Sequence, residues 1–378
     1  MARVLVVGAG LAGLSAAIHA AANGHHVVVL EKSSKIGGRG TSQNQEGFSL
    51  SYGPHLFLKK GPFWKLCRKL SKRKFSSAAI RCDKIEIVGH GTIRPQGNIS
   101  RVLENRHAIK NNDKSNPIVQ GATFLSDWGG ISAPERLIAL MKSKLLVSNE
   151  GWIGMVGRLA AALDEIGVLI ECDVEVKTLH DGHVKLSNGK TIETDVIILA
   201  CGLSKSRQLL LHLDDLTARE TFKQSSKVSA SIIEIGLDAQ SLRGKHAIID
   251  PLNQSAIIDY IGIQSRLSTR GSHLSAITVG GLKGEPGEIK FDSAGDRLQH
   301  LEKFLDTHAS GWKKHIITEL KQEKITIHEG GNPRIDSFAF TQSGILLAGA
   351  WVESEHILAD GAVLSGKIAG QNIARAHH

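Results

Sequence analysis

RVLVVGAGLAGLSAAIHAAANGHHVVVLEKSSKIGGRG, residues 3–40, determines the fold class of this chain. Residues 3–7 are a short apolar run typical of a buried parallel strand, and a G-x-G-x-x-G turn into a helix follows at Gly8, Gly10 and Gly13. The first glycine permits the tight bend, the second lets a pyrophosphate approach the backbone, and the third lets the helix pack closely on the strand. Because a helix N-terminus attracts phosphate, the stretch predicts a dinucleotide site.

A second apolar run, residues 27–30, ends at Glu31, eighteen residues after Gly13. A carboxylate at the end of the second strand can accept both ribose hydroxyls of an adenosine, and it repels a 2′-phosphate. An ordinary surface glutamate is the alternative. The complete strand, turn, helix and strand context favours the ribose-binding role.

The segment GGRGTS, residues 37–42, adds a second glycine pair and the guanidinium of Arg39, which suits bidentate phosphate contact. An NAD site does not need this addition, so the pattern favours FAD. At this point the chain resembles the amine oxidase and phytoene desaturase superfamily of FAD-dependent oxidoreductases, which also includes protoporphyrinogen oxidases. The N-terminal signature of that superfamily is G-x-G-x-x-G, an acidic residue, then G-G-R.

The resemblance implies an α/β fold: a Rossmann-like FAD-binding domain, with a parallel sheet and a β-meander, plus an α+β substrate domain inserted in the chain. A length of 378 residues is also typical of about two domains. We expect a discontinuous FAD-binding domain at residues 1–82, 151–204 and 335–378. The substrate domain is expected at residues 83–150 and 205–334.

Within the second part of the FAD-binding domain, the pattern predicts a helix over 156–166, strands over 168–172 and 174–179, and a buried strand over 196–200. Asp181-Gly182 and Asn188-Gly189 are typical of hairpin turns. The resemblance implies that the backbone of Val176 holds the adenine edge. In the substrate domain, SAPE at 132–135 predicts a helix start, and a later helix is expected around 297–308.

The stretch GFSLSYGPHLF, residues 47–57, resembles the family's G-F-x-x-D-x-G-P-H segment, which runs beside the isoalloxazine ring. Ser51 stands at the acidic position, a departure from the family pattern. Gly53 suits close approach by a flat ring. His55 is either a polar group near the flavin or a hydrogen-bonded structural residue, and both interpretations remain open.

The C-terminal motif combines a buried strand ending, GILLAGAW at 344–351, with a helix start, DGAVLSG at 360–366. The resemblance implies that these segments hold the ribityl chain and the flavin pyrimidine, with the helix N-terminus at residues 361–363 favouring the anionic reduced flavin. Ala350 stands where the family usually has Asp or Glu and removes a hydrogen bond. Glu353 is a candidate to replace it.

These motifs give a defined set of expected site residues. Candidate groups for taking a proton near flavin N5 are His55, Glu353, Glu355 and His356. We expect no metal site, because no His or Cys cluster has metal-ligand spacing. The expected cofactor-binding residues are Gly8, Gly10, Leu11, Ala12, Gly13, Glu31, Lys32, Gly38, Arg39, Gly53, Val176, Gly349, Ala350, Gly361, Ala362 and Val363.

The formal net charge of +9 is unevenly distributed. Residues 59–74 contain eight Lys or Arg and no acid, and Gly61-Pro62 can open an amphipathic helix there. Such a helix is either a solvated face over the core or a peripheral contact with an anionic membrane. Nucleic acid is not an expected partner, because no nucleic-acid motif accompanies the charge.

No run approaches the roughly 20 apolar residues of a membrane-spanning helix. The first predicted strand begins at residue 3, leaving no room for a signal peptide, so we expect a cytoplasmic protein, peripheral to the membrane if the basic helix binds lipid. Cys67, Cys82, Cys172 and Cys201 lack C-x-x-C spacing and are expected to be free buried thiols.

The leading hypothesis is an FAD-dependent oxidoreductase that moves a hydride from an apolar small-molecule substrate to flavin N5, in the manner of phytoene desaturases and protoporphyrinogen oxidases, whose substrates are large and apolar. Amine oxidation is a weaker hypothesis, because only 4% of the residues are aromatic and only two are tyrosines, so few side chains can line an amine site. A lipid carrier of the same fold, like Rab escort proteins and GDP-dissociation inhibitors, is a further alternative, and so is flavin-dependent isomerisation. The substrate and the electron acceptor remain open.

Overall fold

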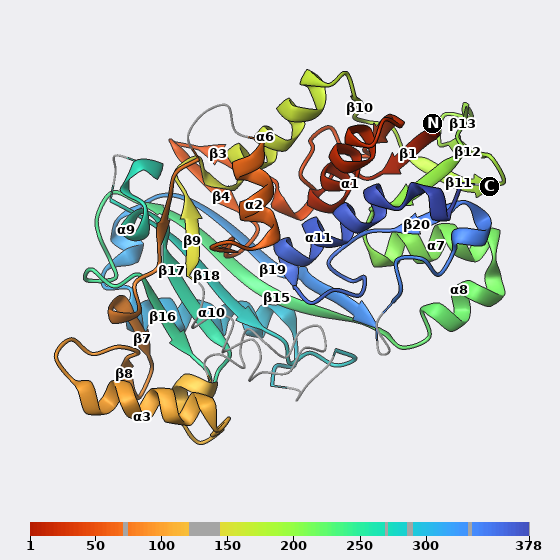
Figure 1. The fold of residues 1–378 in the computed structure, drawn as a ribbon. Helices are drawn as coiled ribbons and strands as arrows, with labels where there is room; N and C mark the ends of the chain where they lie inside the picture. The colour runs from red at the N-terminus through yellow and green to blue at the C-terminus, as the bar shows by residue number, and fades with distance from the viewer. Residues whose placement is uncertain (71–74, 121–143, 269–270, 286–289, 332–334, 378) are drawn as a thin grey trace.

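The computed structural model describes residues 1–70, 75–120, 144–268, 271–285, 290–331 and 335–377 (Figure 1). The helix start expected at 132–135 lies outside the described residues. Within the described ranges, no helix has the length and the apolar character needed to cross a membrane.

A parallel five-stranded sheet, in the order β10-β2-β1-β14-β20, forms the first layer of the molecule. Every neighbouring pair in it is parallel. Strands rich in Val, Ile and Leu suit this position, because a parallel sheet is buried on both faces. The predicted α/β fold class with a Rossmann-like sheet is therefore confirmed. The strands are β1 (Arg3–Val7), β2 (His26–Leu30), β10 (Leu169–Glu171), β14 (Val196–Leu199) and β20 (Ile345–Leu347).

A three-stranded antiparallel meander lies between β10 and β14 in the chain. It consists of β11 (Val176–His180), β12 (His183–Leu186) and β13 (Thr191–Glu193). Gly182 and Gly189 have φ of 69° and 84°, the left-handed backbone that a tight hairpin requires. Both predicted hairpin turns are confirmed.

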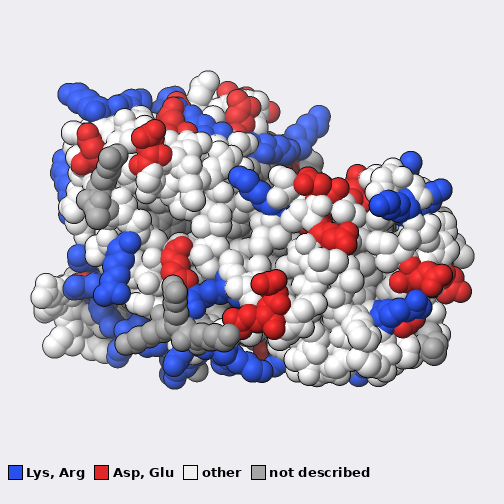
Figure 2. All heavy atoms as spheres, turned by 90° about the horizontal axis from the view of Figure 1, so that it is seen from above, with Lys and Arg blue, Asp and Glu red and all other residues white. Residues whose placement is uncertain are grey.

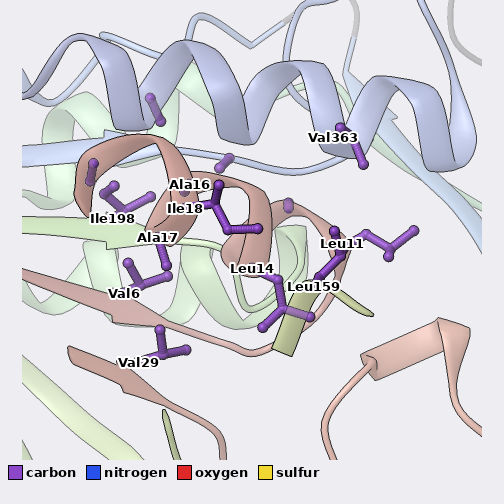
Figure 3. Packing of buried hydrophobic residues seen from close by; sticks show 14 of the residues in the cluster. Val6, Leu11, Leu14, Ala16, Ala17, Ile18, Val29, Leu159, Ile198 and Val363 are labelled. Atoms are coloured by element: carbon purple, nitrogen blue, oxygen red, sulfur yellow. The ribbon is translucent and has the colours of Figure 1, made fainter. Parts of the chain in front are cut away.

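Helix α1 (Leu11–Ala22) lies beside the parallel sheet and contacts two other helices, α6 (Gly151–Glu165) and α11 (Leu358–Gln371). Figure 3 shows how α1 side chains pack on strand residues, with Val363 of α11 close by. Two glycines of α11 let it approach α1 closely: a Cβ at Gly366 would lie 2.2 Å from the Ala12 carbonyl oxygen, and one at Gly370 would lie 2.3 Å from that of Ala16. The contact is therefore backbone on backbone.

A second, seven-stranded sheet has the order β19-β15-β18-β17-β16-β7-β8. Helix α10 (Ala294–His308) packs on β15, β17, β18 and β19, and short α9 (Tyr260–Ile263) follows β17 directly. The strands of this sheet are β7 (Ile85–Ile87), β8 (Gly91–Thr92), β15 (Ser225–Leu237), β16 (Ala247–Asp250), β17 (Ser255–Asp259), β18 (Ser272–Val279) and β19 (Ile316–Gly331).

Smaller elements connect the two sheets. Strand β9 (Leu145–Ser148) lies between β5 (Phe57–Leu58) and β6 (Ser77–Ala79), so part of the segment 83–150 pairs with strands from residues 1–82. Strands from the expected FAD-binding segment 1–82 and the expected substrate segment 83–150 are therefore paired in one small sheet. The remaining helices and strands include β3 (Ser42–Gln45), β4 (Phe48–Ser51), α2 (Pro62–Lys69), α3 (Ile99–Lys110), α7 (Leu203–Leu213) and α8 (Asp215–Thr221).

Some predicted bounds were wrong. Helix α6 begins at Gly151 rather than at residue 156, because the apolar residues Trp152 and Met155 already face the core. Helix α11 begins at Leu358, two residues before the predicted start at Asp360. The four cysteines are free, but only Cys67 is fully buried and Cys82 is exposed.

Candidate functional site

Two glycines of the first turn are required by the protein's own backbone. Gly8 has φ of 106°, and a Cβ there would lie 2.8 Å from the Ala200 carbonyl oxygen. A Cβ at Gly13 would lie 1.8 Å from the Gly8 carbonyl oxygen. Only glycine fits at these positions, whether or not a ligand binds.

Gly10 differs from both, because nothing in the described protein occupies the space beside it. The nearest described heavy atom to a Cβ there would be the Gly37 carbonyl oxygen, at 4.0 Å, and its φ of −77° suits any residue. Gly10 is also the N-cap of α1, which has no side-chain cap and no acidic residue in its first turn. Uncapped N–H groups facing open space are suited to an anion.

The second glycine pair lies against the first. The Gly37 N–H donates to the Ala9 carbonyl oxygen at 2.8 Å, and Gly10 and Gly37 form an isolated parallel bridge. Gly38 is exposed, with φ of 54°. The structure thus brings together the two glycine motifs at the N-terminus of α1, as the sequence predicted for a pyrophosphate site.

Glu31 lies at the end of β2 and is 7% exposed. One carboxylate oxygen accepts from the Ala9 N–H at 2.8 Å and the other from the Ser33 N–H at 3.0 Å. Each oxygen keeps a further lone pair, so two ribose hydroxyls could still donate to it. Lys32, the next predicted site residue, is exposed.

The neighbouring meander is tied to the same place. The Val174 N–H donates to the Glu31 carbonyl oxygen at 2.9 Å, and the side chain of Val176 is buried two residues later. This arrangement puts the expected adenine-binding backbone beside the expected ribose-binding carboxylate. The role of Val176 stays a prediction.

Arg39 makes a different contact from the one expected. Its side chain is exposed, and Nη1 donates to the Ile327 carbonyl oxygen of β19 at 3.2 Å. The guanidinium therefore bridges the glycine loop to the second sheet in this structure. Its contact with a pyrophosphate stays a prediction.

The end of β20 is fixed by a residue that the sequence analysis missed. The buried Ser365 hydroxyl lies 2.9 Å from both the nitrogen and the carbonyl oxygen of Gly349. It joins the loop after β20 to α11, directly beside Ala350, which is 9% exposed. Serine on an otherwise apolar helix face was the only signal in the sequence.

The N-terminus of α11 corrects one expectation. The Gly361 N–H donates to the Ile357 carbonyl oxygen at 3.0 Å, so it is used inside the helix. Because α11 begins at Leu358, its N–H groups without an internal acceptor start there rather than at Gly361. The predicted donors at 361–363 lie one turn too late, and the side chain of Val363 is buried in the α1–α11 contact.

Asp360 is the second residue, after Ser365, whose structural role was not predicted. Its buried carboxylate accepts from the Phe63 N–H at 2.8 Å and from the Leu58 N–H at 3.3 Å. Gly61, the N-cap of α2, has no side chain to do this, so Asp360 caps α2 from 297 residues away. Burial raises the pKa of Asp360 above its ordinary value.

A cavity opens where β4, β9, α6 and α9 meet the second sheet. It measures about 40 Å³, and about 480 Å³ with its open mouth. Gly53, with φ of 96°, lies just behind it against Ile232 of β15. Polar and aromatic groups from both parts of the chain line the cavity, including Ser51, His55, Trp152, Tyr260 and His273.

His55 is held as a neutral group on this cavity. Its ring lies 4.7 Å from that of Trp152, and Nε2 lies 3.2 Å from the Arg39 carbonyl oxygen. Its backbone N–H donates to the Tyr260 hydroxyl at 2.5 Å. Nδ1 is buried and makes no hydrogen bond to a described residue. Burial lowers the pKa of His55 to about 4, so the ring is uncharged near neutral pH.

The other candidate proton acceptors lie elsewhere. Glu353 and Glu355 are exposed, and His356 lies 3.9 Å from the Glu355 carboxylate. None of the three lines the cavity beside His55. The cavity instead contains His273, which the sequence analysis missed because no motif surrounds it.

Comparisons with known proteins agree with this geometry. A family model described as an NAD(P)-binding Rossmann-like domain matches residues 6–70. An L-amino-acid oxidase of Demansia vestigiata is 56% identical over 54 residues, which is 14% of this chain and 10% of the relative. A 4,4'-diapophytoene desaturase of Staphylococcus haemolyticus is 42% identical over 55 residues, which is 15% of this chain and 11% of the relative. The match thus spans about a tenth of each curated relative.

The fold likeness extends further than the sequence likeness. The solved structure of an oxidoreductase from Methanosarcina mazei has a TM-score of 0.70 and 16% identity, with 96% of this chain and 98% of that one covered. These findings confirm the resemblance to amine oxidase and phytoene desaturase sequences at the N-terminus, and they show that nearly the whole chain shares the fold of the Methanosarcina mazei structure.

Proposed function

We propose that this chain is an FAD-dependent oxidoreductase that takes a hydride from an apolar small-molecule substrate. The observation that carries the proposal is the open N-terminus of α1, where Gly10 keeps space free that no described protein atom uses. The paired glycine loops fit a pyrophosphate there, and Glu31 fits the adenosine ribose. When bound, the flavin would supply the two-electron chemistry.

The remaining residues would position substrate and exclude water. The cavity beside His55 has apolar walls from Phe48, Val147 and Trp152. The names of the relatives, a desaturase and an amino-acid oxidase, support oxidation of a C–H bond and leave the substrate class open. A neutral His55 can hold a hydrogen bond to substrate without bringing charge into the site.

A visible absorption spectrum of the purified chain, before and after adding FAD, tests the proposal. We expect a flavin spectrum that bleaches with dithionite, followed by substrate-dependent bleaching with one of a panel of polyenes, porphyrinogens and amines. Bleaching by amines alone would select the amine oxidase alternative. A protein that takes up no FAD would contradict the proposal and favour a lipid carrier. Stable flavin with isomerised product would indicate isomerisation.

We also propose a peripheral contact of α2 with anionic lipid. Phe63, Leu66 and Cys67 are buried under α2, so only its charged face is free: Lys65, Arg68 and Lys69 are exposed. Burial lowers the pKa of His19, and the positive charges of Lys367 and Lys69 act in the same direction. On the face seen in Figure 2, Lys and Arg are mixed with Asp and Glu.

Replacing Lys65, Arg68 and Lys69 with Gln should release the protein from phosphatidylserine vesicles. Each basic residue near an anionic surface is worth about 1 kcal/mol, so the triple variant should bind on the order of a hundredfold more weakly. Co-sedimentation with vesicles at two salt concentrations measures this. A matched change of the exposed Lys177, Lys185 and Lys190 on the meander, outside α2, should have no such effect. Equal sedimentation of both variants would leave α2 as an ordinary solvated face.

A further inference from the structure

A histidine that lines the cavity beside His55 is hydrogen-bonded to a buried acid. Glu234 of β15 is 0% exposed, and Oε2 lies 2.9 Å from Nε2 of His273 on β18. The other carboxylate oxygen accepts from the Ser275 hydroxyl. His273 lines the cavity and Glu234 does not, so the carboxylate stands behind the imidazole.

The imidazole of His273 is held in one orientation. The Tyr260 ring lies against it at 5.0 Å and 61°, and the Phe48 ring lies at 6.1 Å and 76°. With Nε2 directed at Glu234, Nδ1 is the nitrogen left for a ligand, and it makes no hydrogen bond to a described residue. A carboxylate that fixes the ring and the tautomer is the arrangement of a general base with its orienting acid.

Holding the sheet together does not account for this pair. Strands β15 and β18 are already joined by a ladder of eight residue pairs, in which Glu234 lies opposite Ser275. A buried polar pair gives little net stability, because removing it from water costs about as much as its hydrogen bond returns. The buried pair therefore calls for a role other than holding the two strands together.

We propose that Glu234 and His273 form the proton-accepting pair of this cavity, with Nδ1 of His273 taking a proton from the bound ligand. His273 is the catalytic residue of the pair, and Glu234 is a positioning residue that stabilises the imidazolium. The other titratable groups near the ring are Tyr260 of α9, whose ring contacts it, Asp259 at the end of β17, and His55 on the same cavity. Burial raises the pKa of Asp259. Burial raises the pKa of Tyr260 and lowers that of His55, so neither competes for the proton near neutral pH.

A dehydrogenation removes a hydride and a proton, and the pair would accept the proton. This part of the proposal rests on the proposed function. One hydrogen of the substrate would leave as a hydride, with two electrons, which is the chemistry that a bound oxidised flavin would supply. The neighbouring hydrogen leaves as a proton: its bond to the substrate breaks and a bond to Nδ1 of His273 forms. The electron pair left behind becomes the second bond of the product's double bond, so atoms and electrons balance.

The test uses 4-nitrophenol as a probe, because its phenolate absorbs visible light and its phenol form does not. The full chain is titrated with the probe at a pH where the free probe is a phenol. We expect the bound probe to show the phenolate band, because its proton has moved to His273. His273→Gln should lower this band at least about tenfold, and Glu234→Gln should lower it while the probe still binds.

His300→Gln is the matched control, since His300 is a half-buried histidine of α10 that does not line the cavity. Its phenolate band should equal that of the unchanged chain. Circular dichroism checks that each variant folds. If His273→Gln does not fold, the unchanged chain still decides, because a probe bound as phenol, or no binding, overturns the proposal. A band that persists in folded His273→Gln also overturns it.

The flavin spectrum of the same sample, recorded before the probe is added, separates the two proposals. A flavin-free protein that binds nitrophenolate contradicts the oxidoreductase proposal and supports the proton-accepting pair. A flavoprotein that binds no phenolate overturns the pair alone.

Discussion

Gly10→Ala is expected to raise the Kd for FAD by about a hundredfold, a loss of roughly 2.7 kcal/mol, without changing the melting temperature. Apart from its own chain neighbours and helix, the described atom nearest to the new methyl group is the Gly37 carbonyl oxygen at 4.0 Å, and the φ of −77° suits alanine. It would occupy only the space that a pyrophosphate needs at the N-terminus of α1. Fluorescence titration of the apoprotein with FAD, together with thermal melting, measures both quantities.

Gly157→Ala provides the control for this experiment. Gly157 lies on the exposed side of α6, where a Cβ has open space, so alanine there should leave FAD affinity unchanged. Unchanged FAD affinity in Gly10→Ala would mean that the phosphates bind elsewhere, and the proposed cofactor site would have to be abandoned.

Gly366→Ala is expected to destabilise the fold by about 3 kcal/mol, the upper range for overpacking a core. The added Cβ would lie 2.2 Å from the Ala12 carbonyl oxygen and 3.0 Å from the Ser15 Cβ. Backbone atoms cannot rotate away as a side chain can, so α11 must move off α1. Urea unfolding followed by circular dichroism gives the free energy of unfolding.

The same control separates packing from helix propensity. In Gly157→Ala the substitution gains helix propensity at no steric cost, and should stabilise the protein by about 0.5–1 kcal/mol. A Gly366→Ala variant as stable as the unchanged chain would show that α1 and α11 do not touch through their backbones.

Much of the first sheet could be predicted from the sequence, because its signals are local. The spacing of Gly8, Gly10 and Gly13 follows from a single strand-to-helix turn, and the bounds of β1 at Arg3–Val7 agree with the predicted strand. The hairpin glycines Gly182 and Gly189 act through their own backbone dihedral angles. Such features depend on neighbours in the chain rather than on the final fold.

The polar groups of the cavity could not be predicted in this way. Glu234 and His273 are 39 residues apart and meet only because β15 and β18 pair in one register. Neither belongs to a motif, and each is also compatible with an exposed strand position. Glu353 and His356 were candidates in the sequence because they follow the C-terminal glycine motif, yet neither lines the cavity.

The cap that Asp360 provides for α2 has a consequence for the order in which this protein can mature during synthesis. The N-terminus of α2 and the inner face of α1 both depend on residues 345–371, which are synthesised long after α1 and α2. Until then the apolar surfaces that β20 and α11 will cover stay open to aggregation. A nascent chain stalled before residue 345 should therefore be protease-sensitive at α2 and bind chaperones, while synthesis of α11 caps α2 and covers α1 in one step.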